Sequence, residues 1–130
     1  MTLVVLDTHA VQWLAAEPHR LSRPAMAAVS AADSLAVSAI SWYELAWLAH
    51  LGKISVVMPI RSWLDDLARD IRTLGVTPAI ADTAAQLPSS FPGDPADRLI
   101  FATAVEHGAR LITKDRRLRD HRHPRPVTIW

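Results

Sequence analysis

The feature that most constrains this chain is a short apolar run near its start that ends in an acid. Residues Leu3 to Leu6 are apolar without a polar alternate, and Asp7 and Thr8 follow directly. Such a run is typical of a strand that is covered on both faces, as in the middle of a parallel sheet. Asp7 would then stand at the carboxyl end of that strand, which is the edge where open α/β sheets bind their ligands.

Strand-like and helix-like segments alternate along the rest of the chain. Further strands are expected at 35–40, 76–77, 110–113 and 127–129, and helices at 8–16, 22–32, 41–51, 59–74, 80–87 and 94–107, with 54–58 either a small strand or a loop. This alternation indicates βαβ units, a parallel sheet and helices on both of its faces. With 130 residues the chain has the length of one domain, residues 1–130. The sequence therefore predicts a single α/β domain.

Composition excludes several kinds of site. The chain has no cysteine, so disulfides and thiolate metal sites are ruled out. No apolar run approaches the roughly 20 residues that span a bilayer, and the first residues lack the basic start of a signal peptide. We therefore expect a cytoplasmic protein that has no contact with a membrane.

Positive charge is concentrated near the end of the chain, although the net charge is only +1. Seven of the 14 Lys and Arg residues fall within 110–125, namely Arg110, Lys114, Arg116, Arg117, Arg119, Arg122 and Arg125. These residues form either a solvated terminus or a patch that contacts phosphates, and a phosphate patch predicts strongly salt-dependent binding of nucleic acid. Arg116, Arg117 and Arg119 are the candidates for substrate contact.

Three later acids can be assigned to the sheet edge at which Asp7 stands. Asp115 directly follows a predicted strand, whereas Glu44 and Asp97 lie in the first turns of helices that start on the same edge. Taken singly, each acid also has a structural explanation, because the helix dipole favours acids at helix N-termini. Ser41 and Glu44, for instance, have the spacing of a capping box.

Four carboxylates at one edge would repel one another unless some stayed protonated or a cation lay between them. Mg²⁺ or Mn²⁺ would remove this conflict, because both ions prefer oxygen ligands and retain bound waters. The expected metal ligands are Asp7, Glu44, Asp97 and Asp115, although Glu44 could instead orient an attacking water. The hydroxyls of Thr8 and Thr113 would hold carboxylates or waters in place. A cation held in this way can activate water and stabilise charge on a phosphodiester.

The four acids stand in four short motifs. These are Leu6-Asp7-Thr8-His9-Ala10, Ser41-Trp42-Tyr43-Glu44-Leu45, Asp94-Pro95-Ala96-Asp97-Arg98-Leu99-Ile100 with Ala102-Thr103-Ala104, and Leu111-Ile112-Thr113-Lys114-Asp115. In this order and at these intervals the motifs resemble PIN domains, and the closest group looks like the VapC-like toxins of type II toxin–antitoxin pairs. The resemblance covers essentially the whole chain, from Leu3 to the last strand.

The resemblance implies a PIN-like three-layer α/β/α sandwich with a central parallel sheet. It also implies a Mg²⁺- or Mn²⁺-dependent endoribonuclease that acts on RNA, is often a homodimer and is held inactive by a cognate antitoxin. By this resemblance the acidic constellation falls on Asp7, Glu44, Asp97 and Asp115, and the active-site hydroxyl falls on Thr113. Asp94 aligns less well and is expected to be the N-cap of its helix.

Two other functions compete with that of a ribonuclease toxin. The first is a non-catalytic PIN-like module that binds RNA or a partner, but such a module would have no reason to keep a repulsive cluster of acids. The second is a phosphotransferase with Asp7 as nucleophile, and that chemistry usually wants a second acid where His9 stands.

Several other residues have open roles. Arg98 is expected either to pair with an acid or to contact an RNA phosphate. His9 is expected to be structural or to support a metal ligand, rather than to contact substrate or metal itself. His121 and His123 are expected to be a solvated terminal pair rather than a metal clip. The helix at 42–51 is apolar around much of its surface, which hints at a buried contact with a second copy or with an antitoxin.

Overall fold

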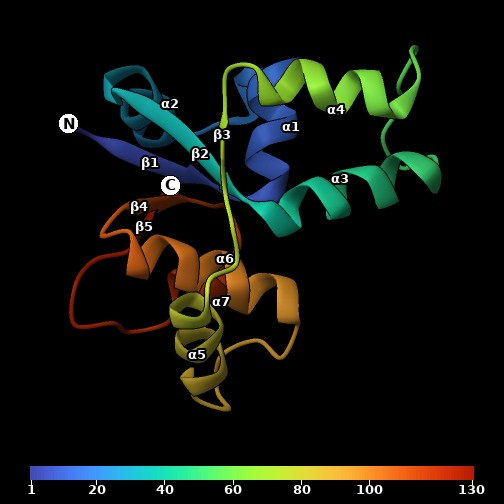
Figure 1. The fold of residues 1–130 in the computed structure, drawn as a ribbon. Helices are drawn as coiled ribbons and strands as arrows, with labels where there is room; N and C mark the ends of the chain where they lie inside the picture. The colour runs from blue at the N-terminus through green and yellow to red at the C-terminus, as the bar shows by residue number, and fades with distance from the viewer.

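A computed structural model describes all residues from 1 to 130 and places five short strands in one parallel sheet (Figure 1). The strands are β1 (Leu3–Leu6), β2 (Ser34–Ser38), β3 (Arg72–Leu74), β4 (Arg110–Ile112) and β5 (Thr128–Ile129), in the spatial order β3-β2-β1-β4-β5. β1 lies in the middle, with Val5 opposite Ala36 of β2 on one side and opposite Leu111 of β4 on the other. The predicted α/β fold with a central parallel sheet is confirmed.

Helices cover both faces of this sheet. They are α1 (Thr8–Ala16), α2 (Arg23–Ala31), α3 (Ala39–His50), α4 (Ile60–Ala68), α5 (Pro78–Gln86), α6 (Pro95–Glu106) and α7 (Arg116–Arg119), with a 3₁₀ turn, η1, at Pro18–Arg20. In Figure 1, α1 to α4 lie on one side of the sheet, and α5, α6 and α7 lie on the other. None of the helices has the length and apolarity that crossing a membrane requires.

Alternate residues of β1 enter two separate hydrophobic cores. Val4 and Leu6 pack with side chains from α1, α2 and α3, whereas Val5 packs on the opposite face with side chains from α6 and α7. All three are at most 2% exposed, which explains why the run contains no polar residue. The two cores and the sheet between them form three layers, as predicted.

The amphipathic segment that was predicted as one helix over 59–74 divides into a helix and a strand. α4 ends at Ala68, and β3 pairs with β2 so that Leu74 lies opposite Ser38. Ile71 and Leu74 continue the apolar stripe of the helix and are both buried, so the hydrophobic period does not reveal where the helix ends. Pairing with the free edge of β2 outweighs the local helical pattern.

The strand predicted at 76–77 is also wrong. Thr77 is the N-cap of α5, and its hydroxyl accepts a hydrogen bond from the backbone N–H of Ile80 at 3.2 Å. Pro78 in the first turn suits a helix start, because its missing N–H would have no partner there.

α3 begins two residues earlier than the sequence predicted. Ser38 is its N-cap, and the Ser38 hydroxyl accepts from the backbone N–H of Ile40 at 3.4 Å. The predicted capping box of Ser41 and Glu44 is therefore wrong. Ser41 is fully buried inside the first turn, and its hydroxyl is directed towards the end of β1.

Candidate active site

Asp7 lies at the carboxyl end of β1 and is the only buried one of the four predicted acids. Its Oδ1 accepts from the backbone N–H of Thr8 at 2.8 Å and caps α1. Its Oδ2 accepts from the hydroxyl of Thr113, which directly follows β4, at 2.6 Å. The same hydroxyl accepts from the backbone N–H of Asp115 at 3.0 Å. Thr113 therefore contacts two of the predicted acids, as the sequence suggested for its hydroxyl.

Glu44 is connected to β1 through Thr8. The Thr8 hydroxyl donates to Oε1 of Glu44 at 2.5 Å and shares a 3.0 Å hydrogen bond with the hydroxyl of Ser41. Burial raises the pKa of Glu44, and the charges of Asp7 and Asp94 raise it further, against the hydrogen bond from Thr8. Glu44 therefore faces the acids of β1 and α6.

Asp97 lies in the first turn of α6, whose N-cap is Asp94, as predicted. Oδ1 of Asp94 accepts from the backbone N–H of Ala96 at 2.8 Å. Burial, followed by the charges of Asp94, Asp7 and Asp115, raises the pKa of Asp97 to about 7. A carboxyl group that is affected by three other acids and is 14% exposed lies within an acidic cluster.

Asp115 caps the short helix α7 and pairs with Arg117. One guanidinium nitrogen of Arg117 lies 2.8 Å from Oδ2 of Asp115 and 3.3 Å from Oδ2 of Asp97. The hydrogen bond from Arg117 holds the pKa of Asp115 below its usual range. The sequence predicted that Arg117 would contact the substrate, whereas here its guanidinium bridges two of the predicted metal ligands.

The four acids lie at one edge of the sheet, but in this arrangement they are not yet a set of ligands for one ion. No group of three acidic or His side chains is close enough to hold a metal ion. The hydroxyl of Thr113 donates a hydrogen bond to one carboxylate oxygen of Asp7, and the hydroxyl of Thr8 donates to one of Glu44. The guanidinium of Arg117 donates to the carboxylates of Asp97 and Asp115. The chemistry of the donors nevertheless fits a hard divalent cation, because all are carboxylate oxygens whose mutual repulsion a cation would relieve.

His9 is engaged in a structural contact, as predicted. Its Nε2 accepts from the backbone N–H of Lys114 at 3.0 Å, and its Nδ1 lies 3.7 Å from Oδ2 of Asp7. Burial lowers the pKa of His9, against the charges of Asp7 and Asp115. The imidazole ring therefore joins the start of α1 to the segment that follows β4.

Arg98 does not pair with an acid, because its guanidinium donates to backbone carbonyls instead. It donates at 2.9 to 3.4 Å to five backbone carbonyls of the segment that precedes α6, those of Ala84, Leu87, Pro88, Phe91 and Pro92. The expected alternative of an acid partner is therefore wrong, whereas a contact of Arg98 with the substrate stays a prediction. No sequence pattern shows which way the carbonyls of a loop point.

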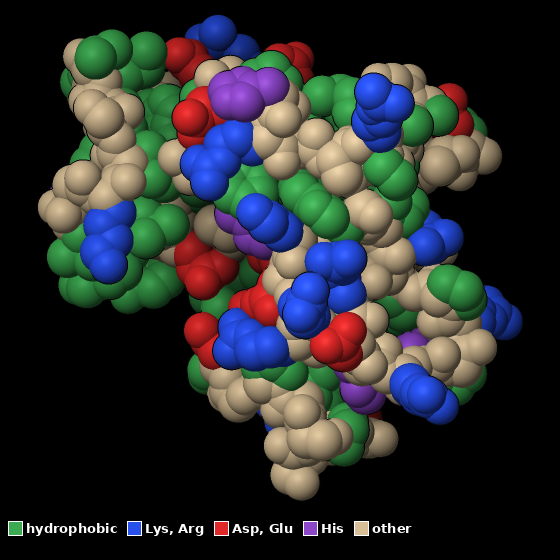
Figure 2. All heavy atoms as spheres, turned by 180° about the vertical axis from the view of Figure 1, so that it is seen from behind, with side chains coloured by type: hydrophobic (Ala, Val, Ile, Leu, Met, Phe, Trp, Pro, Cys, Tyr) green, Lys and Arg blue, Asp and Glu red, His purple; other side chains and the backbone are tan.

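The remaining basic residues lie on the surface around α7. Figure 2 shows a face on which acidic side chains lie among those of Lys and Arg. Arg116 makes no side-chain hydrogen bond or ion pair, and Arg119 donates only to the carbonyl of Lys114 at 3.4 Å. Both remain available for the substrate contact that the sequence predicts.

The prediction of a solvated histidine pair needs correction. His121 packs edge-on against Phe91 and Phe101, with ring centroids 5.1 and 5.4 Å apart. Burial and the charge of His123 lower the pKa of His121. No sequence pattern indicates this contact, because the two aromatic partners come from a loop and from α6.

The sequence indicated an apolar surface on α3, but it did not indicate that two aromatic side chains of this helix line a pocket beside Glu44. Tyr43 and Trp47 are 64% and 54% exposed, and their rings are nearly parallel, with centroids 6.5 Å apart. They line a pocket of about 350 Å³ together with Glu44 and Asp94. The position of Tyr43 directly before Glu44 was the one signal that could have indicated this.

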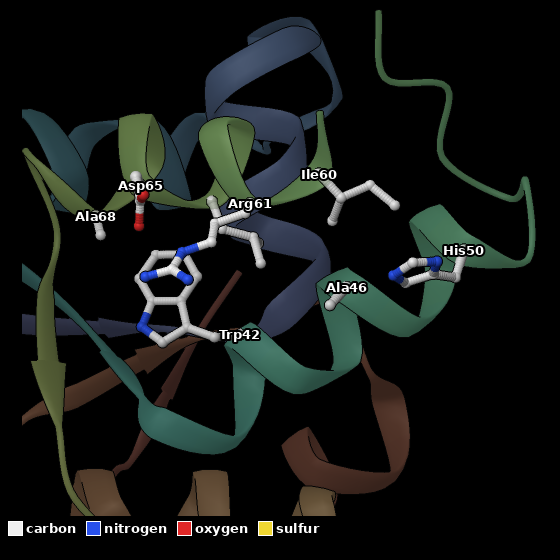
Figure 3. A pocket seen from close by; sticks show the side chains of 8 residues that line it. Trp42, Ala46, His50, Ile60, Arg61, Asp65 and Ala68 are labelled. Atoms are coloured by element: carbon white, nitrogen blue, oxygen red, sulfur yellow. The ribbon is translucent and has the colours of Figure 1, made fainter. Parts of the chain in front are cut away.

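The largest hollow is separate from the acids. It has a volume of about 660 Å³ and lies between α3 and α4. Figure 3 shows Trp42, Ala46 and His50 of α3 facing Ile60, Arg61, Asp65 and Ala68 of α4. None of the four predicted acids lines it, so the site of chemistry is not the largest pocket.

Comparisons of the sequence and of the fold with known proteins lead to one protein family. A family model described as PIN domain matches residues 4–124. Ribonuclease VapC22 of Mycobacterium tuberculosis is 64% identical over 130 residues, which are all of both chains. A toxin–antitoxin complex from Klebsiella pneumoniae has a TM-score of 0.70 at 20% identity, covering 98% of this chain and 96% of that one. DNA-bound VapBC from Salmonella typhimurium has a TM-score of 0.72 at 17% identity, covering 99% and 98%. The resemblance read from the four motifs is confirmed, and this chain belongs to the PIN domain family.

Proposed function

We propose that this protein is a metal-dependent endoribonuclease that acts as the toxin of a type II toxin–antitoxin pair. The observation that carries the proposal is the acidic cluster at one edge of the sheet, in which burial, followed by the charges of Asp94, Asp7 and Asp115, raises the pKa of Asp97 to about 7. Repulsion of this kind is costly for a fold and is relieved when a cation binds. The full-length similarity to a protein named ribonuclease VapC22 supports the same function.

The residues that would hold the cation are Asp7, Glu44, Asp97 and Asp115. The cation is Mg²⁺ or Mn²⁺, which the oxygen-only donor set favours over zinc. When bound, it supplies a water of lowered pKa and positive charge next to the scissile phosphodiester.

The protein's own contribution is to position the acids and to let Asp97 ionise. The hydroxyls of Thr113 and Thr8 fix the carboxylates of Asp7 and Glu44, so these acids keep one orientation as substrate arrives. Asp97 has to lose its proton before it can act as a ligand, and a pKa of about 7 makes this easy near neutral pH. Arg116 and Arg119 would contact RNA phosphates on the adjoining surface.

A toxin of this kind acts on RNA in the cytoplasm and is held by a cognate antitoxin. The solved relatives include a toxin–antitoxin complex and VapBC bound to DNA. The α3–α4 pocket and the exposed side chains of Trp47 in α3 and of Leu51, the C-cap of α3, provide apolar surface for the antitoxin and for a second copy in a homodimer.

The test is cleavage of a mixed, end-labelled RNA pool by antitoxin-free protein in Mg²⁺, in Mn²⁺ and in EDTA. Wild type should cut only with a metal, and Asp97→Asn should not cut at all. Asp70→Asn is the matched control, because this acid is exposed and makes no side-chain contact. It should cut like wild type.

Isothermal titration of the same proteins with Mn²⁺ separates the possible failures. Wild-type protein that binds Mn²⁺ and RNA without cleaving the pool would point to a target absent from it. Wild-type protein that binds RNA but no metal would support the non-catalytic module instead.

A further inference from the structure

Arg117 lies between the two acids that close the candidate metal site on one side. Its guanidinium donates to both oxygens of Asp115, at 2.8 and 3.2 Å, and to Oδ2 of Asp97 at 3.3 Å. The two acids come from different elements, the N-cap of α7 and the first turn of α6. The guanidinium therefore bridges the gap between these elements.

A divalent cation would need the same carboxylate oxygens. Arginine remains charged at any pH the protein can tolerate, so it cannot give up the oxygens by losing a proton. It has to move. The side chain is 64% exposed and starts from a four-residue helix. If it moves, the backbone N–H of Arg117 can keep its own 2.9 Å hydrogen bond to Asp115, the N-cap of that helix. Nothing packed around the guanidinium holds it in place.

A second pocket shows where the guanidinium would go. Arg117 also lines a hollow of about 630 Å³ that lies beside the acids, together with Pro88, Ser90, Pro92, Asp120, His121 and Arg122. Two arginines, a serine hydroxyl and an imidazole in this hollow are donors suited to a phosphate group and outnumber its one acid, Asp120. Arginine binds phosphate through two parallel N–H bonds.

We propose that Arg117 couples cation binding to RNA binding: without metal it holds Asp97 and Asp115 together, and when a cation takes those acids it turns into the adjoining pocket and binds an RNA phosphate beside the scissile bond. This inference rests on the proposed function, because it needs both a cation and an RNA substrate. It predicts that the cation competes with Arg117 for the two carboxylates, and that the affinity for RNA rises once Arg117 is displaced.

The experiment compares wild type, Arg117→Ala and Arg116→Ala at constant ionic strength. Arg116 is the matched control, because it lies in the same helical turn, has the same charge and makes no side-chain contact. Mn²⁺ affinity is measured by isothermal titration without RNA. Affinity for a short fluorescein-labelled single-stranded RNA is measured by anisotropy with and without Mn²⁺, and the RNA is checked for cleavage afterwards. Thermal unfolding confirms that each variant folds.

Arg117→Ala should bind Mn²⁺ more tightly than wild type, because the ion no longer has to displace a guanidinium. The gain should be only roughly three- to tenfold, because partly exposed ion pairs of this kind are weak. Arg116→Ala should change Mn²⁺ affinity much less. In RNA binding, Mn²⁺ should strengthen the affinity of wild type and of Arg116→Ala by a larger factor than that of Arg117→Ala.

Four results would overturn the proposal. Equal tightening in both variants would show a general effect of charge rather than competition. Unchanged or weaker Mn²⁺ binding in Arg117→Ala would show that Arg117 only organises the acids. An equal effect of Mn²⁺ on RNA binding in all three proteins would remove the coupling. A wild type that binds no Mn²⁺ would refute the proposed function itself, and this inference with it.

Discussion

Thr113 and Asp7 stand 106 positions apart in the chain, and the hydroxyl of Thr113 donates a hydrogen bond to Oδ2 of Asp7 at 2.6 Å. The bond joins the ends of two neighbouring strands, β1 and β4, inside the buried edge of the sheet. Because the same hydroxyl accepts from the backbone N–H of Asp115, one side chain sets the positions of two acids relative to each other.

Thr113→Val keeps the shape of the side chain and removes both hydrogen bonds. The free energy of unfolding should fall by about 1–3 kcal/mol, because an oxygen of a buried carboxylate loses its donor. Mn²⁺ affinity should fall as well, since Asp7 is no longer held in place.

The matched control for Thr113→Val is Thr103→Val. Thr103 is equally buried, but its hydroxyl donates to the carbonyl of Leu99 within α6 at 2.7 Å. Chemical denaturation and isothermal titration should show that this variant loses stability without losing Mn²⁺ affinity. Loss of affinity in both variants would mean that stability alone determines metal binding.

Asp97→Asn should change how stability depends on pH. The ordinary pKa of 3.8 rises to about 7 in the folded protein, so the folded state binds this proton more strongly than the unfolded state. Stability contributed by the protonated carboxyl is present below pH 4 and is lost as the pH rises through about 7. In EDTA the variant should therefore match wild type near pH 4 and exceed it at pH 8, by on the order of 1–3 kcal/mol.

Urea unfolding at both pH values checks this prediction for Asp97. Added Mn²⁺ should then stabilise wild type at pH 8 and leave the variant almost unchanged, because only the native wild-type site binds the ion. A variant that is less stable than wild type at pH 8 without metal would show that Asp97 is needed for the fold instead of the cation.

Arg98→Leu should loosen the segment that leads into α6. Five carbonyls lose their shared donor, and hydrogen bonds to a charged group are worth about 1.5–3 kcal/mol. The midpoint temperature of thermal unfolding should lie well below that of wild type, and backbone amide hydrogen exchange should become faster between Leu87 and Gly93. Arg122→Leu is the control, because Arg122 is exposed and donates to no carbonyl. If both variants unfold alike, the contacts of Arg98 contribute nothing.

Replacing Arg116 and Arg119 together with alanine should weaken RNA binding and flatten its salt dependence. For single-stranded RNA, each lost phosphate contact lowers the slope of log affinity against log salt by about 0.7. Two contacts would therefore reduce the slope by about 1.4. Anisotropy titrations over a range of KCl concentrations measure it, and an unchanged slope would assign both residues to a solvated surface.

The strands on either side of the site were predictable because their sequences have one explanation. Leu3–Leu6 and the segment before Thr113 are apolar on both faces, which only a covered strand requires, and an acid follows each. The edge of a parallel sheet then gathers those acids. The end of the helix predicted at 94–107 was equally clear, because a glycine follows it, and Gly108 indeed adopts a positive φ of 61°.

The errors arose where a local pattern had two explanations and tertiary contacts chose between them. Ser41 and Glu44 have the spacing of a capping box, yet Ser38 is the N-cap of the helix. The side chains of Ser41 and Glu44 instead form hydrogen bonds with the hydroxyl of Thr8. β3 carried a helical stripe and became a strand because the edge of β2 was free. Both outcomes depend on partners more than 30 residues away, which no local window contains.

The central position of β1 also has a consequence for protein synthesis. β1 is the first strand to be made, and its second neighbour, β4, begins only at Arg110. A chain that is still on the ribosome before that point has an open sheet edge at β1, and Asp7 lacks the hydroxyl of Thr113. The four acids can therefore come together only after Thr113 and Asp115 have been synthesised, so a chain that stops before β4 has no complete acidic site.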